Sequence, residues 1–321
     1  MPIRSLLKPG VWTQRVIEAW WQAMPGRLDP VIYTWPVSAE ECRDVVIRWP
    51  DKASYRWPPR KIWGDQVLGA LRRHVRCEET DLPQPFDGVI SFEAIIRGRR
   101  WRVNVETSDY APLNEEAYAA CDLHFKMEYA LEGYGERDHL VPGGYVNADA
   151  AIYAYLPRLR ALRDHAPPKY EVHGRFGLSM EKRRRPMEIL RASRRFRFFG
   201  GEGKVRYRQF LVEVARSKVC IDLPSMSSVT FRMIDYLAIG CCIVGPPHTN
   251  RMIVPFQDRV HCAYCRPDYS DLEDVVAYYL DPAHEEERLT LVRNSRAFFD
   301  AYLHRDQLAT YYVRQMLDRL R

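Results

Sequence analysis

The chain has 321 residues, 46% of them hydrophobic, and eight cysteines, a composition that excludes a disordered chain or a disulfide-rich secreted scaffold and favours two globular domains with reduced thiols. Its net charge of +6 is unevenly divided, because residues 1–150 hold 19 lysines and arginines against 22 acids and residues 151–321 hold 29 against 20. No run of about 18 apolar residues occurs, and the N-terminal stretch lacks the apolar core and cleavage site of a signal peptide, so we expect a cytoplasmic protein whose second half binds an anion.

The first half alternates helical and extended patterns and is predicted to form one α/β domain, residues 1–165. Apolar residues at helical spacing predict helices, and short runs of β-branched and aromatic residues predict strands. The expected helices are 11–24, 61–75, 114–121 and 147–165, and the expected strands are 31–35, 44–49, 122–127 and two strands within 86–110 that meet at a turn at Arg97 and Gly98.

Two prolines, Pro167 and Pro168, end the last of these helices and mark a linker at 166–170. Strands and helices then alternate more regularly, which predicts βαβ units, a mainly parallel sheet and a second domain, residues 166–321. The expected strands are 170–176, 195–200, 218–223, 241–245 and 259–264, and the expected helices are 181–193, 206–217, one from near Val229 to Gly240, 271–280, 283–303 and 306–320.

The stretch SMSSVTFRMIDYLAIGCCIVGPP, residues 225–247, concentrates polar side chains at a strand-to-helix corner. A helix N-terminus at the carboxyl end of a parallel strand presents free N–H groups and a positive dipole, which favour a negative ligand. Ser227 or Ser228 suits the N-cap, and Thr230 adds a third hydroxyl. Arg232, in the first turn, opposes the helix dipole unless an anion lies opposite. The corner predicts a phosphate site, with simple capping and a solvated arginine as the alternative.

Asp235 follows Arg232 by three residues, which allows an ion pair between them on one face of the helix. Alternatively, Asp235 accepts hydrogen bonds from the hydroxyls of a ribose or another sugar. The spacing leaves both interpretations open.

The run RQFLVEVARSKVCIDLPSMSSVTFRMIDYLAIGCCIVGPP, residues 208–247, resembles the donor-binding half of GT-B glycosyltransferases, particularly the group 1 and exostosin-like branches. A strand that starts at Ser-Lys, a helix of the pattern S-x-R-x-x-E-x-L-A-x-G and a buried strand recur there in this order. Asp235 stands where the family more often has glutamate. Residues 271–299 are also similar, and the resemblance covers about residues 171–300.

The resemblance implies two Rossmann-like domains with a cleft between them and a nucleotide-sugar, predicted to be a UDP-sugar, held mostly by the second domain. The residues that would hold the donor are Ser227, Ser228, Thr230 and Arg232 at the diphosphate, Asp235 at the ribose, and Gly174 and Arg175 in the loop HGRFG. No metal and no other cofactor is predicted, because no DxD pair occurs and the CxxC motif at Cys262 and Cys265 lacks a second pair of zinc ligands.

An inverting glycosyltransferase needs a base that takes the proton of the acceptor hydroxyl, and in this architecture the base normally comes from the first domain. Asp109 is the first choice, because it follows a predicted strand in a loop with Thr107 and Ser108. Glu106 and Glu93 come next. A retaining enzyme would need no such base.

Two segments, 51–61 and 182–208, mix basic and aromatic residues. Such mixtures can follow a nucleic-acid backbone and stack on its bases. Tyr55 and Trp57 of the first segment are therefore acceptor-side candidates, and Lys126, in the segment FKMEYALEGYG (125–135), is a further candidate because it is expected to line the cleft. The alternative function is a non-catalytic nucleic-acid-binding protein, and a nucleic acid is also a conceivable acceptor, as for enzymes that glycosylate modified bases of viral DNA.

Several enzyme classes lose their usual support, because no Walker loop, GxGxxG, HExxH or GxSxG motif occurs. ATPases, classical dehydrogenases, zincins and α/β-hydrolases are the classes concerned.

Overall fold

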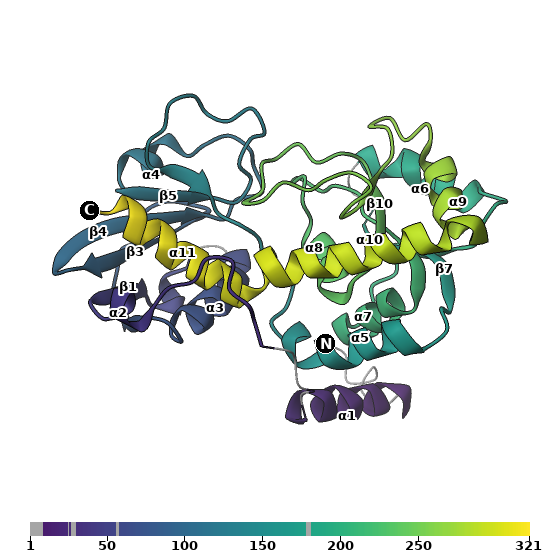
Figure 1. Ribbon diagram of the computed structural model, residues 1–321, viewed down its shortest axis with the longest axis horizontal. Coiled ribbons are helices and arrows are strands. Elements are labelled where there is room, and N and C mark those ends of the chain that lie inside the picture. Colours follow the sequence, from purple (N-terminus) through teal and green to yellow (C-terminus); the bar gives the residue numbers. More distant parts are fainter. Residues whose placement is uncertain (1–8, 25, 27–29, 56–57, 178–180) are drawn as a thin grey trace.

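A computed structural model describes residues 9–24, 26, 30–55, 58–177 and 181–321. It shows two β-sheets, of six and five strands, with helices packed around them (Figure 1). The predicted α/β class with two sheets is confirmed. Within the described ranges, no helix has both the length and the apolar character that crossing a bilayer requires.

The first sheet consists of β1 (Val45–Pro50), β2 (Arg76–Thr80), β3 (Val89–Ile96), β4 (Arg99–Glu106), β5 (Leu123–Lys126) and β6 (Leu140–Pro142). Its order is β2-β1-β3-β4-β5-β6, and it is mixed, because β3 runs antiparallel to both β1 and β4 while the other neighbours are parallel. The expected hairpin joins β3 to β4, where Arg97 and Gly98 take positive φ angles of 51° and 79°, as a two-residue turn of this kind requires.

The second sheet is parallel throughout and consists of β7 (Tyr170–Arg175), β8 (Phe198–Gly201), β9 (Ser217–Ile221), β10 (Cys242–Gly245) and β11 (Ala263–Tyr264). Its order is β11-β10-β9-β7-β8. The strand that follows β7 in the chain, β8, therefore lies on one side of β7, and the next strand, β9, lies on the other side. Parallel sheets of this kind bind ligands beyond the carboxyl ends of the strands at that switch point, here between β7 and β9.

Helices separate most strands of the second half, whereas β2, β3 and β4 of the first half follow one another without a helix between them. Those up to residue 165 are α1 (Pro9–Ala23), α2 (Ala39–Cys42), α3 (Pro58–Leu71), α4 (Glu115–Ala119) and α5 (Ile152–His165), with the short helix η2 (Lys52–Ser54). Those that follow are η3 (Glu181–Arg183), α6 (Arg184–Ala192), α7 (Tyr207–Ala215), α8 (Phe231–Ile239), α9 (Leu272–Leu280), η4 (Pro282–His284), α10 (Glu285–Phe298), the π-helix η5 (Phe299–Leu303) and α11 (Arg305–Arg319).

Two helices cross from one half of the chain to the other. Helix α5 packs against α7 and α8, and Arg160 Nε donates to the carbonyl of Ala238 over 2.9 Å. Helix α11 lies against α3 beside the first sheet (Figure 1), where the Tyr312 hydroxyl donates to the carbonyl of Gly143 over 2.5 Å. The division into residues 1–165 and 166–321 stays a prediction, and helices of each half pack against the other half.

The predicted strand at 31–35 is wrong, because these residues form no strand. The N–H of Thr34 donates to Gln307 Oε1 over 3.0 Å, and its hydroxyl donates to the carbonyl of Ala301 over 2.7 Å. The segment is therefore tied to the C-terminal helices rather than to a sheet. Conversely, β2 was missed, since its sequence RCEET is polar and forms a strand only by pairing with β1.

Candidate active site at the start of helix α8

A cavity of about 220 Å³ opens at the start of helix α8, and both halves of the chain line it. The first half contributes Asp109, Met127 and Tyr145, and the second contributes Arg183, Ser225, Ser227, Val229, Thr230, Phe231 and Arg232. Four residues chosen from the sequence thus meet in one place: Asp109, Ser227, Thr230 and Arg232. The cavity lies just beyond β9, where the sheet topology leads one to expect a ligand.

Thr230 caps helix α8. Its backbone is extended, and its Oγ1 accepts a hydrogen bond from the N–H of Met233 over 3.1 Å. The same hydroxyl donates to Asp222 Oδ1 over 2.7 Å. The cap is therefore Thr230 rather than Ser227 or Ser228, and the helix begins at Phe231, two residues later than expected. Its positive end meets the cavity, which favours a negative group there.

Two arginines face this end of the helix but share one nearby carboxylate. Arg232 Nη1 lies 3.1 Å from Asp222 Oδ1, whereas the hydrogen bonds of the buried Arg183 to residues that the structure describes go to main-chain carbonyls, those of Gly177, Leu223 and Pro224. Burial, and then the positive charge of Arg232, lowers the pKa of Arg183. At the helix end itself, two guanidinium groups lie near one carboxylate, which favours an anionic group beside the start of α8.

The two serines before the helix differ in where their hydroxyls point. Ser227 is buried and its Oγ donates to the carbonyl of Val229 over 2.8 Å, yet the residue lines the cavity. Ser228 Oγ instead accepts from the N–H of Thr249 over 2.7 Å, and its own N–H lies 3.3 Å from Glu128 Oε2. Ser228 thus ties the corner to its neighbours, and its hydroxyl is already occupied.

Two carboxyl groups of the first half lie at or near the cavity, those of Asp109 in its lining and of Glu128 beside the lining residue Tyr145. Asp109 is exposed at the cavity, and partial burial of its carboxyl raises its pKa. Glu128 is buried, and its Oε1 accepts from the Tyr145 hydroxyl over 2.5 Å. Burial, with a smaller contribution from the charge of Asp109, raises the pKa of Glu128. Carboxyl groups with raised pKa values near arginines are suited to proton transfer.

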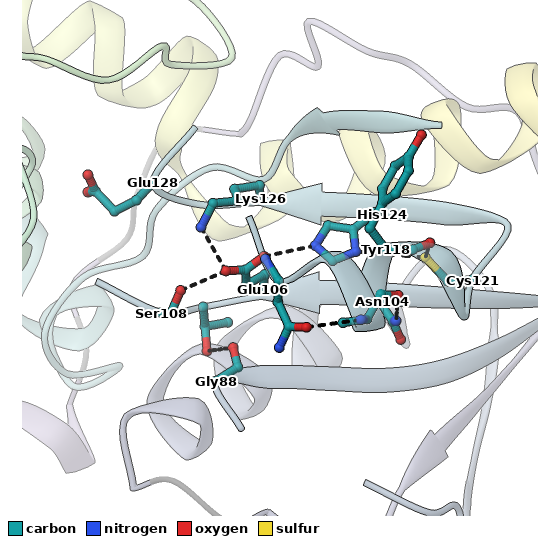
Figure 2. Close-up of polar contacts among 12 residues, drawn as sticks. Gly88, Asn104, Glu106, Ser108, Tyr118, Cys121, His124, Lys126 and Glu128 are labelled. Atoms are coloured by element: carbon teal, nitrogen blue, oxygen red, sulfur yellow. Dashed lines mark hydrogen bonds and ion pairs between the residues drawn. The ribbon is translucent and has the colours of Figure 1, made fainter. Parts of the chain in front are cut away.

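Glu106 does not reach the cavity but forms a buried cluster behind it (Figure 2). Its carboxylate accepts a hydrogen bond from Lys126 Nζ over 2.8 Å and lies 3.1 Å from His124 Nε2. Burial opposes ionisation of Glu106, but His124 and Lys126 outweigh it and lower its pKa. Glu106 is a poor proton acceptor, because its pKa is low and both oxygens of its carboxylate already have hydrogen-bond partners. Lys126 is wholly buried, which corrects its assignment to the acceptor side.

Glu93 and Tyr55 lie elsewhere. Glu93 pairs with Arg48 over 2.7 Å and with Arg100 over 3.5 Å, and it lines a separate cavity of about 280 Å³ with Arg102. Tyr55 is buried and accepts a hydrogen bond from Trp49 Nε1, so packing rather than acceptor binding accounts for it. Trp57 lies outside the described residues.

Gly174 and Arg175 end strand β7 near the switch point. Arg175 is engaged by Glu213, with Nε 2.6 Å from Oε2, and by the carbonyl of Gly203 over 2.8 Å. Burial opposes ionisation of Glu213, but hydrogen bonds from His173 and Arg175 lower its pKa to about 2. A Cβ at Gly174 would lie 2.6 Å from the ring of Phe176, so packing requires this glycine. The structure does not bring either residue to the cavity lining.

Asp235 is buried at the contact between the two halves, which corrects its assignment to a ribose. Its Oδ1 accepts from Asn147 Nδ2 and from the Tyr207 hydroxyl, each over 2.9 Å. Burial raises its pKa to about 7. The ion pair with Arg232 that the spacing allowed does not form either, since Arg232 turns to Asp222.

The basic and aromatic segment 182–208 is largely used within the protein. Phe196 is buried, and Phe199 stacks on Tyr170 with ring centroids 4.0 Å apart. Several of its arginines have acidic partners, such as Arg206, which lies 3.0 Å from Glu18. This packing does not favour the nucleic-acid alternative.

Metal ligands do not converge in the part of the chain that the structure describes, where no three or more His, Cys, Asp or Glu side chains are placed to hold an ion. Cys262 and Cys265 are both buried. The CxxC motif is therefore part of the packing of the second sheet.

Sequence reasoning missed Asp222, Arg183, Tyr145 and Glu128. Asp222 carried a usable signal, because it is an acid directly after the apolar strand KVCI, at the edge where ligands bind. Arg183 carried none, since it is one of several arginines in a basic run. Only the fold shows that this one is buried beside Arg232.

A comparison with known protein families agrees with the expected class. Residues 180–314 match a family described as "Glycosyl transferase-like", which confirms the resemblance to glycosyltransferases over most of the second half. Among solved structures, the chain is similar to a glycosyltransferase from Rickettsia africae ESF-5, with 11% identity, 68% of this chain and 70% of the other covered, and a TM-score of 0.35. No curated protein matches it. The family match supports glycosyl transfer as the general activity.

Proposed function

We propose that the protein transfers a sugar from a nucleotide-diphosphate donor, a UDP-sugar, to an acceptor hydroxyl on a glycan or a modified DNA base. The observation that carries this proposal is the cavity at the start of helix α8, which is lined by Asp109 of the first half and by Arg183 and Arg232 of the second. A transferase needs a base on one side of the sugar and a cationic site for the leaving group on the other.

The donor side is the helix corner. The diphosphate would sit against the N-terminus of α8, where Arg232, Arg183 and the dipole supply positive charge and Ser227 lies close by. Charge builds up on the diphosphate as the glycosidic bond breaks, so fixed positive groups stabilise the transition state more than the bound donor.

The acceptor side is Asp109. In the proposed step the acceptor oxygen attacks the anomeric carbon, and its proton passes to the Asp109 carboxylate. The bond between the anomeric carbon and the phosphate oxygen breaks, and its electron pair leaves with the nucleoside diphosphate. A single displacement of this kind inverts the anomeric configuration.

We also propose that the reaction proceeds without a metal ion and in the cytoplasm. The sequence has no DxD pair, and the arginines can take over the charge neutralisation that a metal supplies in other transferases. Turnover that is unchanged by a chelator is the expected result.

A panel of nucleotide-sugars tests the function directly. Ligands that bind only the folded protein raise its melting temperature, so UDP and UDP-sugars are expected to stabilise it more than the corresponding monophosphates do. Hits are then incubated with protein and water alone, and release of UDP is measured. Absence of stabilisation by every nucleoside diphosphate in the panel would contradict the proposal.

A further inference from the structure

The buried carboxylate of Glu106 collects hydrogen bonds from three segments of the first half (Figure 2). Lys126 Nζ and His124 Nε2, both on β5, lie 2.8 Å and 3.1 Å from it. Ser108 Oγ donates to Oε1 over 2.9 Å, and the N–H of Asn114 donates to Oε2 over 3.2 Å. Both carboxylate oxygens are therefore doubly engaged.

Two of these contacts hold the loop that carries Asp109. Ser108 precedes Asp109, and Asn114 is the N-cap of helix α4, where the loop ends. Lys126 adds a third contact, because its Nζ also donates to the carbonyl of Tyr110 over 2.7 Å. The loop is thus held to one buried ion pair immediately before and after Asp109.

The base of the loop is fixed by the neighbouring strand as well. The N–H of Thr107 donates to the carbonyl of Gly88 over 2.7 Å. Gly88 has a φ of 73°, and a Cβ there would lie 3.1 Å from the Cβ of Ser108. Close backbone approach at this point leaves the loop little freedom to shift.

The ion pair is itself rigid. Lys126 and His124 are fully buried and Glu106 nearly so, and no solvent competes for their hydrogen bonds. A buried charge without access to water has few other groups to bind, so the geometry of its hydrogen bonds is well defined. Glu128, on the same segment, points away from this cluster (Figure 2).

We infer that Glu106, with Lys126, is a positioning residue that holds the 107–114 loop so that the Asp109 carboxylate faces the arginines across the cavity. Glu106 acts through Asp109 and touches no substrate. The inference rests on the proposed role of Asp109 as the base of a glycosyl transfer.

The test is a double-mutant cycle on turnover of UDP-glucose, or of the panel member that turns over fastest, followed as UDP release. Asp109→Asn is expected to lower kcat about 100-fold or more, as loss of a general base does. Glu106→Gln, which puts an amide where two donors converge, is expected to lower kcat about 10-fold or more while the KM for the donor changes by less than about 2-fold. The double variant is expected to be no slower than Asp109→Asn alone, because Glu106 acts only through Asp109.

Two further variants keep the test decisive. Glu93→Gln removes a carboxylate of the same sheet that pairs with Arg48 away from the cavity, and it is expected to leave kcat unchanged. Ser108→Ala removes one contact of the loop without changing the charge of the cluster, so it serves if Glu106→Gln does not fold. It is expected to lower kcat by a smaller factor, again with an unchanged donor KM and again without effect in the Asp109→Asn background.

The outcomes separate the two levels of the proposal. Full turnover by Asp109→Asn would refute the role of Asp109 as base and with it the positioning role. Slow turnover by Asp109→Asn together with normal kcat in both Glu106→Gln and Ser108→Ala, or losses that multiply in the double variants, would overturn the positioning role and leave the proposed function standing.

Discussion

The two arginines at the start of helix α8 decide what the cavity can bind. Arg232 has an acidic partner in Asp222, whereas Arg183 has main-chain carbonyls. A guanidinium group bound only by carbonyls keeps its full charge while it loses most of its hydration. The residue-scale consequence is a built-in preference for an anionic group.

Replacing Arg232 by methionine is expected to weaken UDP binding. The variant keeps an unbranched apolar stem but removes the guanidinium group, which lies over the ring of Phe176, and with it one charge-assisted contact to phosphate. Dissociation constants measured by calorimetry should rise about 10-fold to 100-fold. Arg293→Met is the matched control, because Arg293 pairs with Glu286 on the exposed side of α10. Equal affinity of wild type and Arg232→Met for UDP would contradict the assignment.

The pH dependence of turnover reports on Asp109. The base must be ionised to accept a proton, and burial raises the pKa of this carboxyl above the ordinary value of 3.8. Activity is therefore expected to be complete at neutral pH and to be lost as the pH falls through the raised pKa. The acid limb of a kcat/KM profile should lie above pH 3.8 and should disappear in Asp109→Asn. If the acid limb persists in the Asp109→Asn variant, it arises from the titration of another group and not from Asp109.

Helix α8 carries the site because its two ends are well defined. Thr230 caps the N-terminus, and Gly240 ends the helix with a φ of 85°, the left-handed conformation typical of a C-terminal glycine. Seven of its nine residues are buried, so the helix is held between the second sheet and the neighbouring helices. A helix fixed in this way presents its N-terminus to the cavity in one orientation.

Gly240→Ala is expected to destabilise the protein. A Cβ there would lie 3.0 Å from the Cβ of Arg296 and 3.3 Å from the carbonyl of Val292, in addition to the strained φ. The expected loss in the free energy of unfolding is about 1–3 kcal/mol, measured by denaturant titration. Gly69→Ala is the control, because Gly69 lies inside α3 and, apart from its own helix backbone and chain neighbours, no described atom lies within 4 Å of the added carbon. That change should stabilise the protein by about 0.5–1 kcal/mol, and similar effects at both positions would refute the argument.

At the scale of the whole molecule, a buried polar cluster joins the two halves. Asn147, which follows the first sheet, and Tyr207, at the start of α7, both donate to Asp235 on α8. Gln66 on α3 donates in turn to the carbonyl of Asn147 over 2.9 Å. The relative placement of base and arginines therefore depends on contacts behind the cavity as well as within it.

Asp235 makes the stability of the whole molecule depend on pH. Its pKa of about 7 in the folded protein exceeds the ordinary 3.8, so between these values the folded state holds a proton that the unfolded chain has lost. The contribution of this group to stability is therefore complete below about pH 4 and declines as the pH rises to about 7. Asp235→Asn removes the decline, and the variant should gain on the order of 1–4 kcal/mol over wild type between pH 4 and 7.

Denaturant titrations of both proteins across this range measure the gain, and UDP affinity should not change. Stability curves that run parallel from pH 4 to 7, or a loss of UDP binding in Asp235→Asn, would show that Asp235 does not act as a buried structural acid.

The sequence by itself determined the elements whose reasons are local. The alternating patterns after residue 166 predicted β7, α6, α7, β9, α8, β10 and α9, and Gly240 marked the end of α8, because periodicity and left-handed glycine are properties of neighbouring residues. The hydroxyls and Arg232 at the corner were found for the same reason. Thr34 shows the limit, since its segment has the apolar pattern of a strand but bonds to helices far along the chain.

Only the tertiary structure decided which charged groups share the site. Glu106, Lys126 and Asp235 look like surface groups in the sequence, and the fold buries all three, whereas it brings Arg183, Arg232 and Asp109 to the lining of one cavity. The physical reason is that burial and partner choice depend on contacts between residues far apart in the sequence, such as Glu128 and Ser228, which are 100 positions apart. Electrostatic energy in a protein interior depends on these distances, which no local pattern contains.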